Sequence, residues 1–74
     1  MARMTKSNHK AIAESLRIAR RKIYDTERPE VIKDMWDGMN YGIDYMVDVF
    51  RANNPAFDAD AFRTASGYYM IPTR

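Results

Sequence analysis

The sequence has no cysteine, and it has only three prolines and three glycines among 74 residues. The lack of thiols excludes disulfides and zinc sites built on thiolates. It also agrees with a reducing cytosol. A chain of this length forms one domain, residues 1–74, and the core of so small a domain is marginally stable. We therefore expect very good packing, a binding partner or self-association to supply further stability.

Long uncharged hydrophobic runs are absent too. No apolar segment follows Met1, so we expect no signal peptide. The longest stretch without a charge in the central part of the chain runs from Gly38 to Ile43, far short of the roughly 20 residues that span a bilayer. These absences predict a soluble, cytoplasmic protein that does not enter a membrane.

Neither sign of charge dominates, because the formal net charge is +2. The charges are unevenly placed, with +5 on residues 1–28 and −3 on residues 29–74. So small a net charge argues against a protein whose main task is to coat nucleic acid. The uneven placement still allows a local basic patch, or a folded chain in which the two halves attract each other.

What is present favours a small all-α domain of three helices: a helical hairpin, then a short C-terminal helix and an extended tail. A first helix is predicted from about Asn8 to about Tyr24, with Thr5 or Ser7 as its N-cap. Its apolar stripe has the i, i+4, i+7 and i+11 spacing of one helical face and consists of Ile12, Leu16, Ala19 and Ile23. The stripe is about 100° wide, which suits a helix packed on one side.

A second helix is predicted from about Pro29 to about Ala52. Arg28 precedes proline and resists the helical conformation, and Pro29 fits the first helical position, although Thr26 is an alternative cap. The apolar residues of this helix cover an arc of about 200°. We expect the first helix to cover, in an antiparallel hairpin, the part that consists of Ile32, Trp36, Met39, Ile43, Val47 and Phe50.

The rest of that arc is a candidate self-association face. It consists of Val31, Met35, Gly38, Gly42, Tyr45 and Val49. Its two glycines lie one turn apart and each costs about 1 kcal/mol of helix propensity relative to alanine, which suggests close approach of another backbone or of a large side chain. A two-fold homodimer would bury this face. A kink, or cover from the third helix and the tail, is the competing interpretation.

A third helix is predicted from about Ala59 to Ser66. Asp58 is a good N-cap, and Phe57 and Phe62 have the spacing of a hydrophobic staple. Gly67 suits the position just after a helix. The apolar tail, residues 68–72, is predicted to be extended, and it could lie across the helices.

Residues 54–67 also carry a recognisable pattern: Asn-Pro-x-Phe-Asp, three residues, Phe, two residues, Ala, one residue, Gly. This pattern resembles the ending of small helical bacteriophage proteins of unassigned activity. The resemblance implies a phage origin and action inside an infected bacterium, and it implies no activity. Ser66 stands where many such proteins have Cys or Ala, which argues against a thiol role here.

The basic cluster of the first helix is a candidate contact for phosphate or for a partner. It consists of Arg17, Arg20, Arg21 and Lys22. The same residues lie in the last turns of the helix, where cations stabilise the negative end of its dipole. A DNA-binding interpretation also lacks a recognition helix, because the exposed face of the second helix is acidic. Nucleic acid is therefore a less favoured partner.

Other chemistry is sparse. His9 has no companion residues of a catalytic arrangement, so a surface or capping role is expected. The acidic residues Asp37, Asp44 and Asp48 indicate a solvated face, or one paired with the basic first helix, rather than a cation site. Trp36 and Met39 have core spacing. No phosphate loop, metal-ligand spacing or nucleophile motif is present, so we expect no enzyme, no metal and no cofactor.

Two classes of function remain. The first is a non-enzymatic module that docks on a host or phage protein and modulates it, a counter-defence role being one version. The alternative is an accessory protein that binds nucleic acid with the basic end of the first helix.

Overall fold

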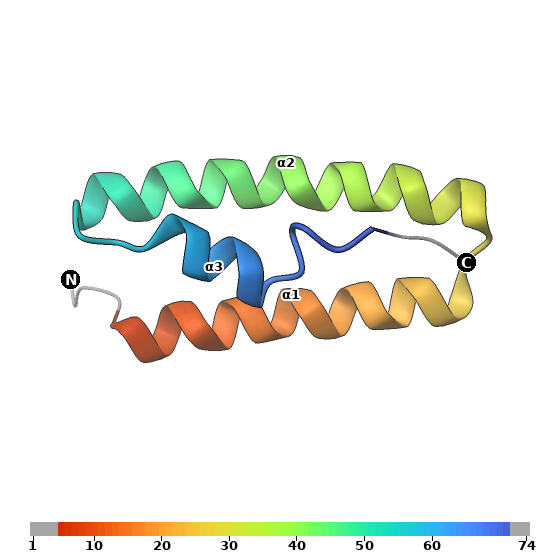
Figure 1. Cartoon of the computed structure of the whole chain (residues 1–74), viewed down its shortest axis with the longest axis horizontal. Helices are drawn as coiled ribbons and strands as arrows, with labels where there is room; N and C mark the ends of the chain where they lie inside the picture. The colour runs from red at the N-terminus through yellow and green to blue at the C-terminus, as the bar shows by residue number, and fades with distance from the viewer. Residues whose placement is uncertain (1–4, 72–74) are drawn as a thin grey trace.

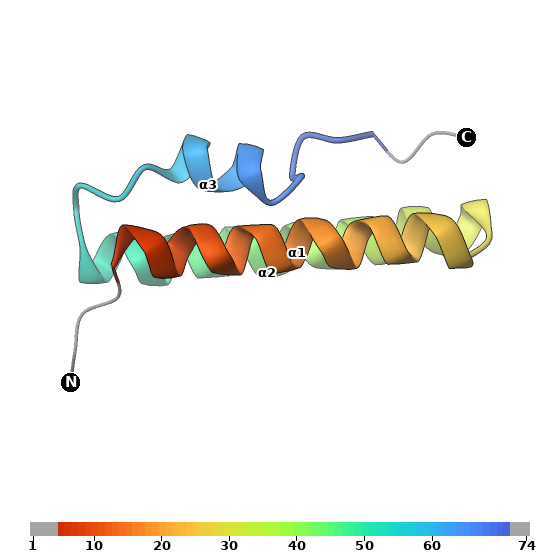
Figure 2. The ribbon, with the colours of Figure 1, turned by 90° about the horizontal axis from the view of Figure 1, so that it is seen from below.

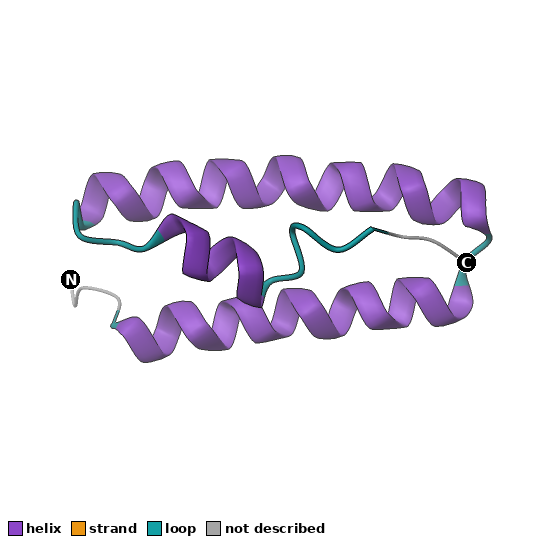
Figure 3. Cartoon of the chain, in the orientation of Figure 1, coloured by secondary structure: helices purple, strands orange, loops and turns teal. Residues whose placement is uncertain are grey.

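A computed structural model describes residues 5–71, and these fold into three helices and no strands (Figure 3). Helix α1 comprises Lys6–Thr26, α2 comprises Pro29–Asn53, and α3 comprises Ala59–Ala65. The two long helices run side by side in opposite directions, with α3 and the tail lying along them (Figure 1). The predicted all-α hairpin with a short third helix is confirmed. The tail is not extended throughout, because residues 66–69 form turns in which the Tyr68 N–H donates to the Arg63 carbonyl at 3.0 Å, and residue 72 of the predicted tail lies outside the described residues.

Helix α1 is longer than its sequence indicated, by two residues at each end. Thr5 is the N-cap, because its hydroxyl oxygen accepts a hydrogen bond of 3.2 Å from the Asn8 backbone N–H. This satisfies one of the amide groups that the start of a helix leaves without a partner. The cap is therefore Thr5 and not Ser7.

The turn between α1 and α2 is short. Arg28 has an extended backbone with φ −76° and ψ 153°, as expected for a residue before proline, and Pro29 is the first residue of α2. Thr26 is not the cap, since it belongs to α1 and its hydroxyl donates to the Lys22 carbonyl at 2.7 Å. A connection this short requires the antiparallel hairpin that is observed.

Helix α3 begins and ends with the predicted local chemistry. The Asp58 side chain accepts a hydrogen bond of 3.0 Å from the Ala61 N–H, and the Phe57 and Phe62 rings lie 5.7 Å apart. After Ser66 the chain turns at Gly67, whose φ of 81° lies in the left-handed region that favours glycine. This turn directs the tail back over α2.

The core lies where the three helices meet. Its fully buried apolar residues are Ala13, Ile43, Val47, Phe50, Ala59 and Phe62. Figure 2 shows that α1 and α2 form one layer and that α3 and the tail cover only one side of it. The other side of the hairpin has no cover from the described residues.

The predicted stripe of α1 is displaced from the actual contact face. Ala13 and Arg20 are the buried positions of α1, whereas Ile12, Leu16 and Ile23 are half-buried and Ala19 is exposed. The displacement arises because α1 has two neighbours. Helix α3 packs against the side of α1 that carries Ala13, so the stripe lies at the edge of the contact rather than at its centre.

Candidate protein-binding surface

Arg20 lies in the interior of the protein, with only 1% of its surface exposed. Its Nε–H donates to the Ser66 carbonyl at 2.8 Å, and its Nη2 donates to the Asn40 side-chain oxygen. The guanidinium carbon also lies 4.9 Å from the centre of the Trp36 ring, a cation–π distance. Arg20 thus joins α1 to α2 and to the turn after α3.

Burial has an electrostatic cost for this cation. Loss of solvent lowers the pKa of Arg20 from its ordinary value, and its Nη1 is buried without a hydrogen-bond partner. Arginine nevertheless keeps its proton in proteins, so the interior holds a positive charge. The neutral acceptors Ser66 and Asn40 and the Trp36 ring stabilise it.

This position corrects the interpretation of the basic cluster. Arg20 cannot reach a phosphate outside the protein, whereas Arg17, Arg21 and Lys22 are exposed on α1. The Arg21 Nε lies 3.3 Å from the Asp25 carboxylate, an exposed i, i+4 pair worth only a few tenths of a kcal/mol. The predicted cluster of four cations is thus a smaller and partly neutralised group on the surface.

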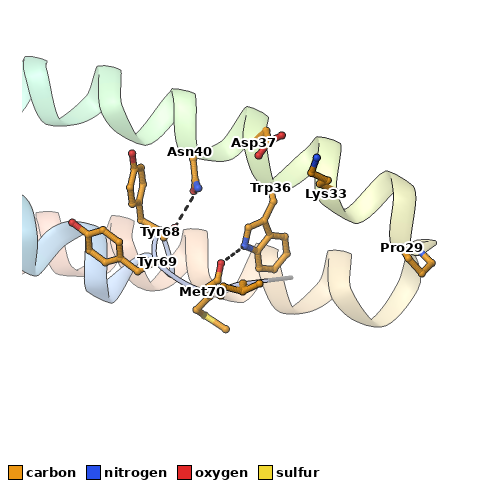
Figure 4. A pocket seen from close by; sticks show the side chains of 9 residues that line it. Pro29, Lys33, Trp36, Asp37, Asn40, Tyr68, Tyr69 and Met70 are labelled. Atoms are coloured by element: carbon orange, nitrogen blue, oxygen red, sulfur yellow. Dashed lines mark hydrogen bonds between the residues drawn. The ribbon is translucent and has the colours of Figure 1, made fainter. Parts of the chain in front are cut away.

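Side chains of α2 hold the tail in place by donating hydrogen bonds to the backbone of the tail (Figure 4). The Trp36 indole N–H donates to the Met70 carbonyl at 2.9 Å, and the Asn40 side-chain amide donates to the Tyr68 carbonyl at 3.2 Å. These contacts fix the backbone of residues 68–70 while the side chains of Tyr69, Met70 and Ile71 remain exposed. The sequence left open whether the tail packs, and the structure places it across α2.

An open groove of about 500 Å³ lies between the tail and the start of α2. We call it the tail groove, and its lining residues are Pro29, Lys33, Trp36, Asp37, Asn40, Tyr68, Tyr69, Met70 and Ile71. Ile71 is 76% exposed, which is a large fraction for an apolar side chain whose neighbours are also apolar. Contiguous exposed apolar side chains of this kind are typical of interaction sites.

Asp44 organises the surface beside the groove. One carboxylate oxygen accepts from Arg63 at 3.0 Å and the other accepts from the Tyr68 hydroxyl at 3.2 Å. The hydrogen bond to Asp44 raises the pKa of Tyr68 and also that of Arg63. Asp37 and Asp48 remain exposed. Within residues 5–71, no group of three or more His, Asp or Glu side chains is arranged to hold a metal ion.

His9 is part of an aromatic cluster rather than a simple surface or capping residue. Its ring centre lies 4.6 Å from that of Phe50 and 4.8 Å from that of Phe57. The half-buried imidazole therefore packs where the start of α1 meets the end of α2. Its ring contributes to the packing at this end of the hairpin.

The candidate self-association face, which we call the α2 stripe, is open to solvent. Its residues are Val31, Met35, Gly38, Gly42, Tyr45 and Val49. Tyr45 is 73% exposed and Val49 is 56% exposed, while Val31 and Gly42 are half-buried. A Cβ atom added at Gly38 or at Gly42 would meet nothing within 4 Å among the described residues. Helix α3 and the tail therefore do not cover this stripe, and α2 continues through both glycines as one helix.

Comparisons with models of protein families, with curated proteins and with solved structures found no match for this chain. The resemblance of residues 54–67 to phage proteins therefore stays a prediction. None of the helices in residues 5–71 combines the length and the apolar character that crossing a membrane requires. The tail groove and the α2 stripe, the two exposed apolar surfaces, are the candidate binding sites of the described residues.

Sequence reasoning identified the α2 stripe and missed the tail groove. Nothing in the pattern of residues 68–71 indicated which of the tail side chains would point outward. Arg20 was wrongly placed on the surface, because it shares a helical face with Ala13, and Ala13 lies outside the apolar stripe that the sequence predicted.

Proposed function

We propose that this chain is a non-enzymatic protein-binding module that docks on another protein through the tail groove. The observation that carries the proposal is the fixed backbone of the tail, which presents Tyr69, Met70 and Ile71 to solvent. Prior ordering of a binding segment lowers the entropy lost on association. Tyrosine and methionine are also enriched at protein interfaces.

The charges around the groove indicate the chemistry of the partner. Asp37 lies in the groove, and Asp44 lies next to it beside Tyr41 and Tyr68. Lys33 is the one cation among the lining residues. A partner segment with an apolar anchor and a nearby basic side chain fits this surface best. Phosphate groups fit it less well, because Asp37 would repel them, while the charge of Asp44 is already balanced by Arg63.

The biological setting follows from the resemblance to phage proteins. On that basis the partner is a host or phage protein in the cytoplasm of an infected bacterium, and docking modulates it. The accessory protein that binds nucleic acid remains the rival function. Burial of Arg20 weakens that rival, because only Arg17, Arg21 and Lys22 of the cluster face solvent.

An affinity capture from bacterial lysate tests the proposal. The immobilised chain should retain a specific protein after nuclease treatment, and Ile71→Ser and Tyr69→Ser should each abolish the capture. Ile18→Ser is the matched control, because Ile18 is a similarly exposed residue on α1 away from the groove. Capture that nuclease removes, or that Arg17→Ala with Arg21→Ala removes while Ile71→Ser does not, would favour the nucleic-acid function instead.

A further inference from the structure

The α2 stripe lies on the side of α2 that faces away from the tail. Each residue of an α-helix turns by about 100°, so Tyr45 lies half a turn around the helix from Trp36, whose indole contacts the tail. The stripe recurs at alternating intervals of four and three residues, the spacing of a seam between packed helices. Nothing in residues 5–71 occupies the space above its glycines. The α2 stripe therefore has the residue spacing of a helix–helix contact, but no second helix among residues 5–71 packs on it.

The stripe is symmetric about position 40. Val31 and Val49 are equally distant from that position, and so are Gly38 and Gly42. The remaining pair is Met35 and Tyr45. A two-fold axis beside position 40 would place each residue against its counterpart in an antiparallel copy of α2. Valine would then meet valine, glycine would meet glycine, and the Met35 thioether would meet the Tyr45 ring, a favourable sulfur–aromatic contact.

We propose that two copies of this chain form an antiparallel, two-fold homodimer through the α2 stripe, with the axis beside position 40. A two-fold interface uses the same patch on both subunits, so that patch must be complementary to itself. The paired Gly38 and Gly42 let the two helix backbones approach closely. The dimer is independent of the proposed partner, since the tail groove lies on the other side of α2.

The available area reaches the size that a specific dimer interface requires. The stripe spans 18 residue intervals, or about 27 Å of helix. Helical geometry places the half-buried Met39 and Met46 between the stripe and α1, where Ile12, Leu16 and Ile23 are also half-buried. Apolar surface thus extends over two helices whose axes lie about 10 Å apart. A face about 20 Å wide and 27 Å long gives roughly 1,000 Å² or more over both copies, the size at which specific interfaces begin.

The charges at the edge of the stripe determine how the stability of the dimer depends on salt. Asp34 and Asp48 are exposed beside it, and the antiparallel register brings Asp34 of one copy nearest Asp48 of the other. Two such like-charged pairs form, related by the two-fold axis. Added salt screens them, so the dimer should tighten as ionic strength rises, which is the opposite of a complex held by charge attraction.

The first experiment measures mass by light scattering during gel filtration at micromolar concentration. We expect twice the chain mass of 8.7 kDa, and a mass of one chain overturns the proposal. Gly42→Arg should give one chain with helix content unchanged by circular dichroism. Tyr45→Glu should do the same, and its exposed position protects the fold. Ala61→Arg, at an exposed site on α3, is the control and should remain a dimer. A two-chain mass for both stripe variants overturns the proposal.

The second experiment tests the register. Because the chain has no cysteine, Val31→Cys with Val49→Cys provides the only thiols for a short bifunctional maleimide. The double variant should be cross-linked into dimers, while each single variant should not. Cross-linking of Val31→Cys alone would indicate parallel helices and overturn the antiparallel register.

A third experiment tests the like-charged pairs. Asp48→Asn should lower the dissociation constant of the dimer about two- to fivefold, as expected for removal of like-charge pairs between helices. A weaker dimer contradicts this register.

Discussion

The guanidinium of Arg20 lies over the indole ring of Trp36, with its central carbon 4.9 Å from the ring centre. A cation–π contact of this kind contributes about 0.5–2 kcal/mol, more when water is excluded. Trp36 in turn donates to the Met70 carbonyl, so the same pair of side chains joins α1, α2 and the tail. The tail groove therefore depends on a residue that does not line it.

Arg20→Ala should lower the free energy of unfolding by about 2–3 kcal/mol, because it removes two hydrogen bonds from a charged donor and leaves the Ser66 carbonyl without that donor. Arg20→Met should cost less, since it keeps apolar volume and removes a buried charge. Urea unfolding measures both. Arg17→Ala is the exposed control and should change stability by less than about 0.5 kcal/mol. Equal effects at positions 17 and 20 would contradict burial of Arg20.

Gly67→Ala should destabilise the fold by about 1–3 kcal/mol. A side chain is strained at φ 81°, and the new Cβ would lie 2.8 Å from Arg20 Cδ. A double-mutant cycle tests this, in which thermal unfolding is compared for the original chain, Gly67→Ala, Arg20→Ala and the double variant. The penalty at Gly67 should shrink in the Arg20→Ala background, because the close contact is gone while the backbone strain remains. A penalty that stays the same would mean that the Arg20 contact does not contribute to it.

Phe62→Ala should cost about 3–5 kcal/mol, since Phe62 is 4% exposed in the core and its ring contacts Phe50 edge-to-face and Phe57 at a tilt. A loss of this size is large against the stability of a domain this small and is expected to lower the melting temperature sharply. Ile18→Ala, the control, removes apolar atoms from the surface and should have little effect. An unchanged melting temperature for Phe62→Ala would show that α3 does not pack on the hairpin.

Stability should fall at alkaline pH in a way that depends on Tyr68. Its hydroxyl donates to Asp44, which raises the pKa of Tyr68 above its ordinary value of 10.0. A group whose pKa is raised in the folded state stabilises that state below its unfolded pKa, and this contribution is lost as pH rises through the folded value. Tyr68→Phe should therefore flatten the decline above about pH 10. Tyr41→Phe, at an exposed tyrosine, should leave that decline unchanged.

Much of the fold follows from chemistry that acts within a few residues. Thr5 and Asp58 cap their helices because a side-chain oxygen three positions back reaches a free amide group, whatever the rest of the chain does. Pro29 starts α2 because its missing N–H costs nothing at that position. Gly67 follows α3 because it tolerates positive φ. Such signals lie in the sequence itself, and they set the number, order and approximate ends of the helices.

The candidate sites depended on tertiary structure to a larger extent. Arg20 resembles its neighbours Arg17 and Arg21 in sequence, and only the convergence of Asn40, Ser66 and Trp36 on its side of α1 makes the interior acceptable for a cation. Likewise, the width of the apolar arc on α2 showed that two sides needed cover but did not say which side α3 would take. Packing decided that question, because α3 and the tail could bury only one side of the hairpin. The side that they left exposed is the α2 stripe.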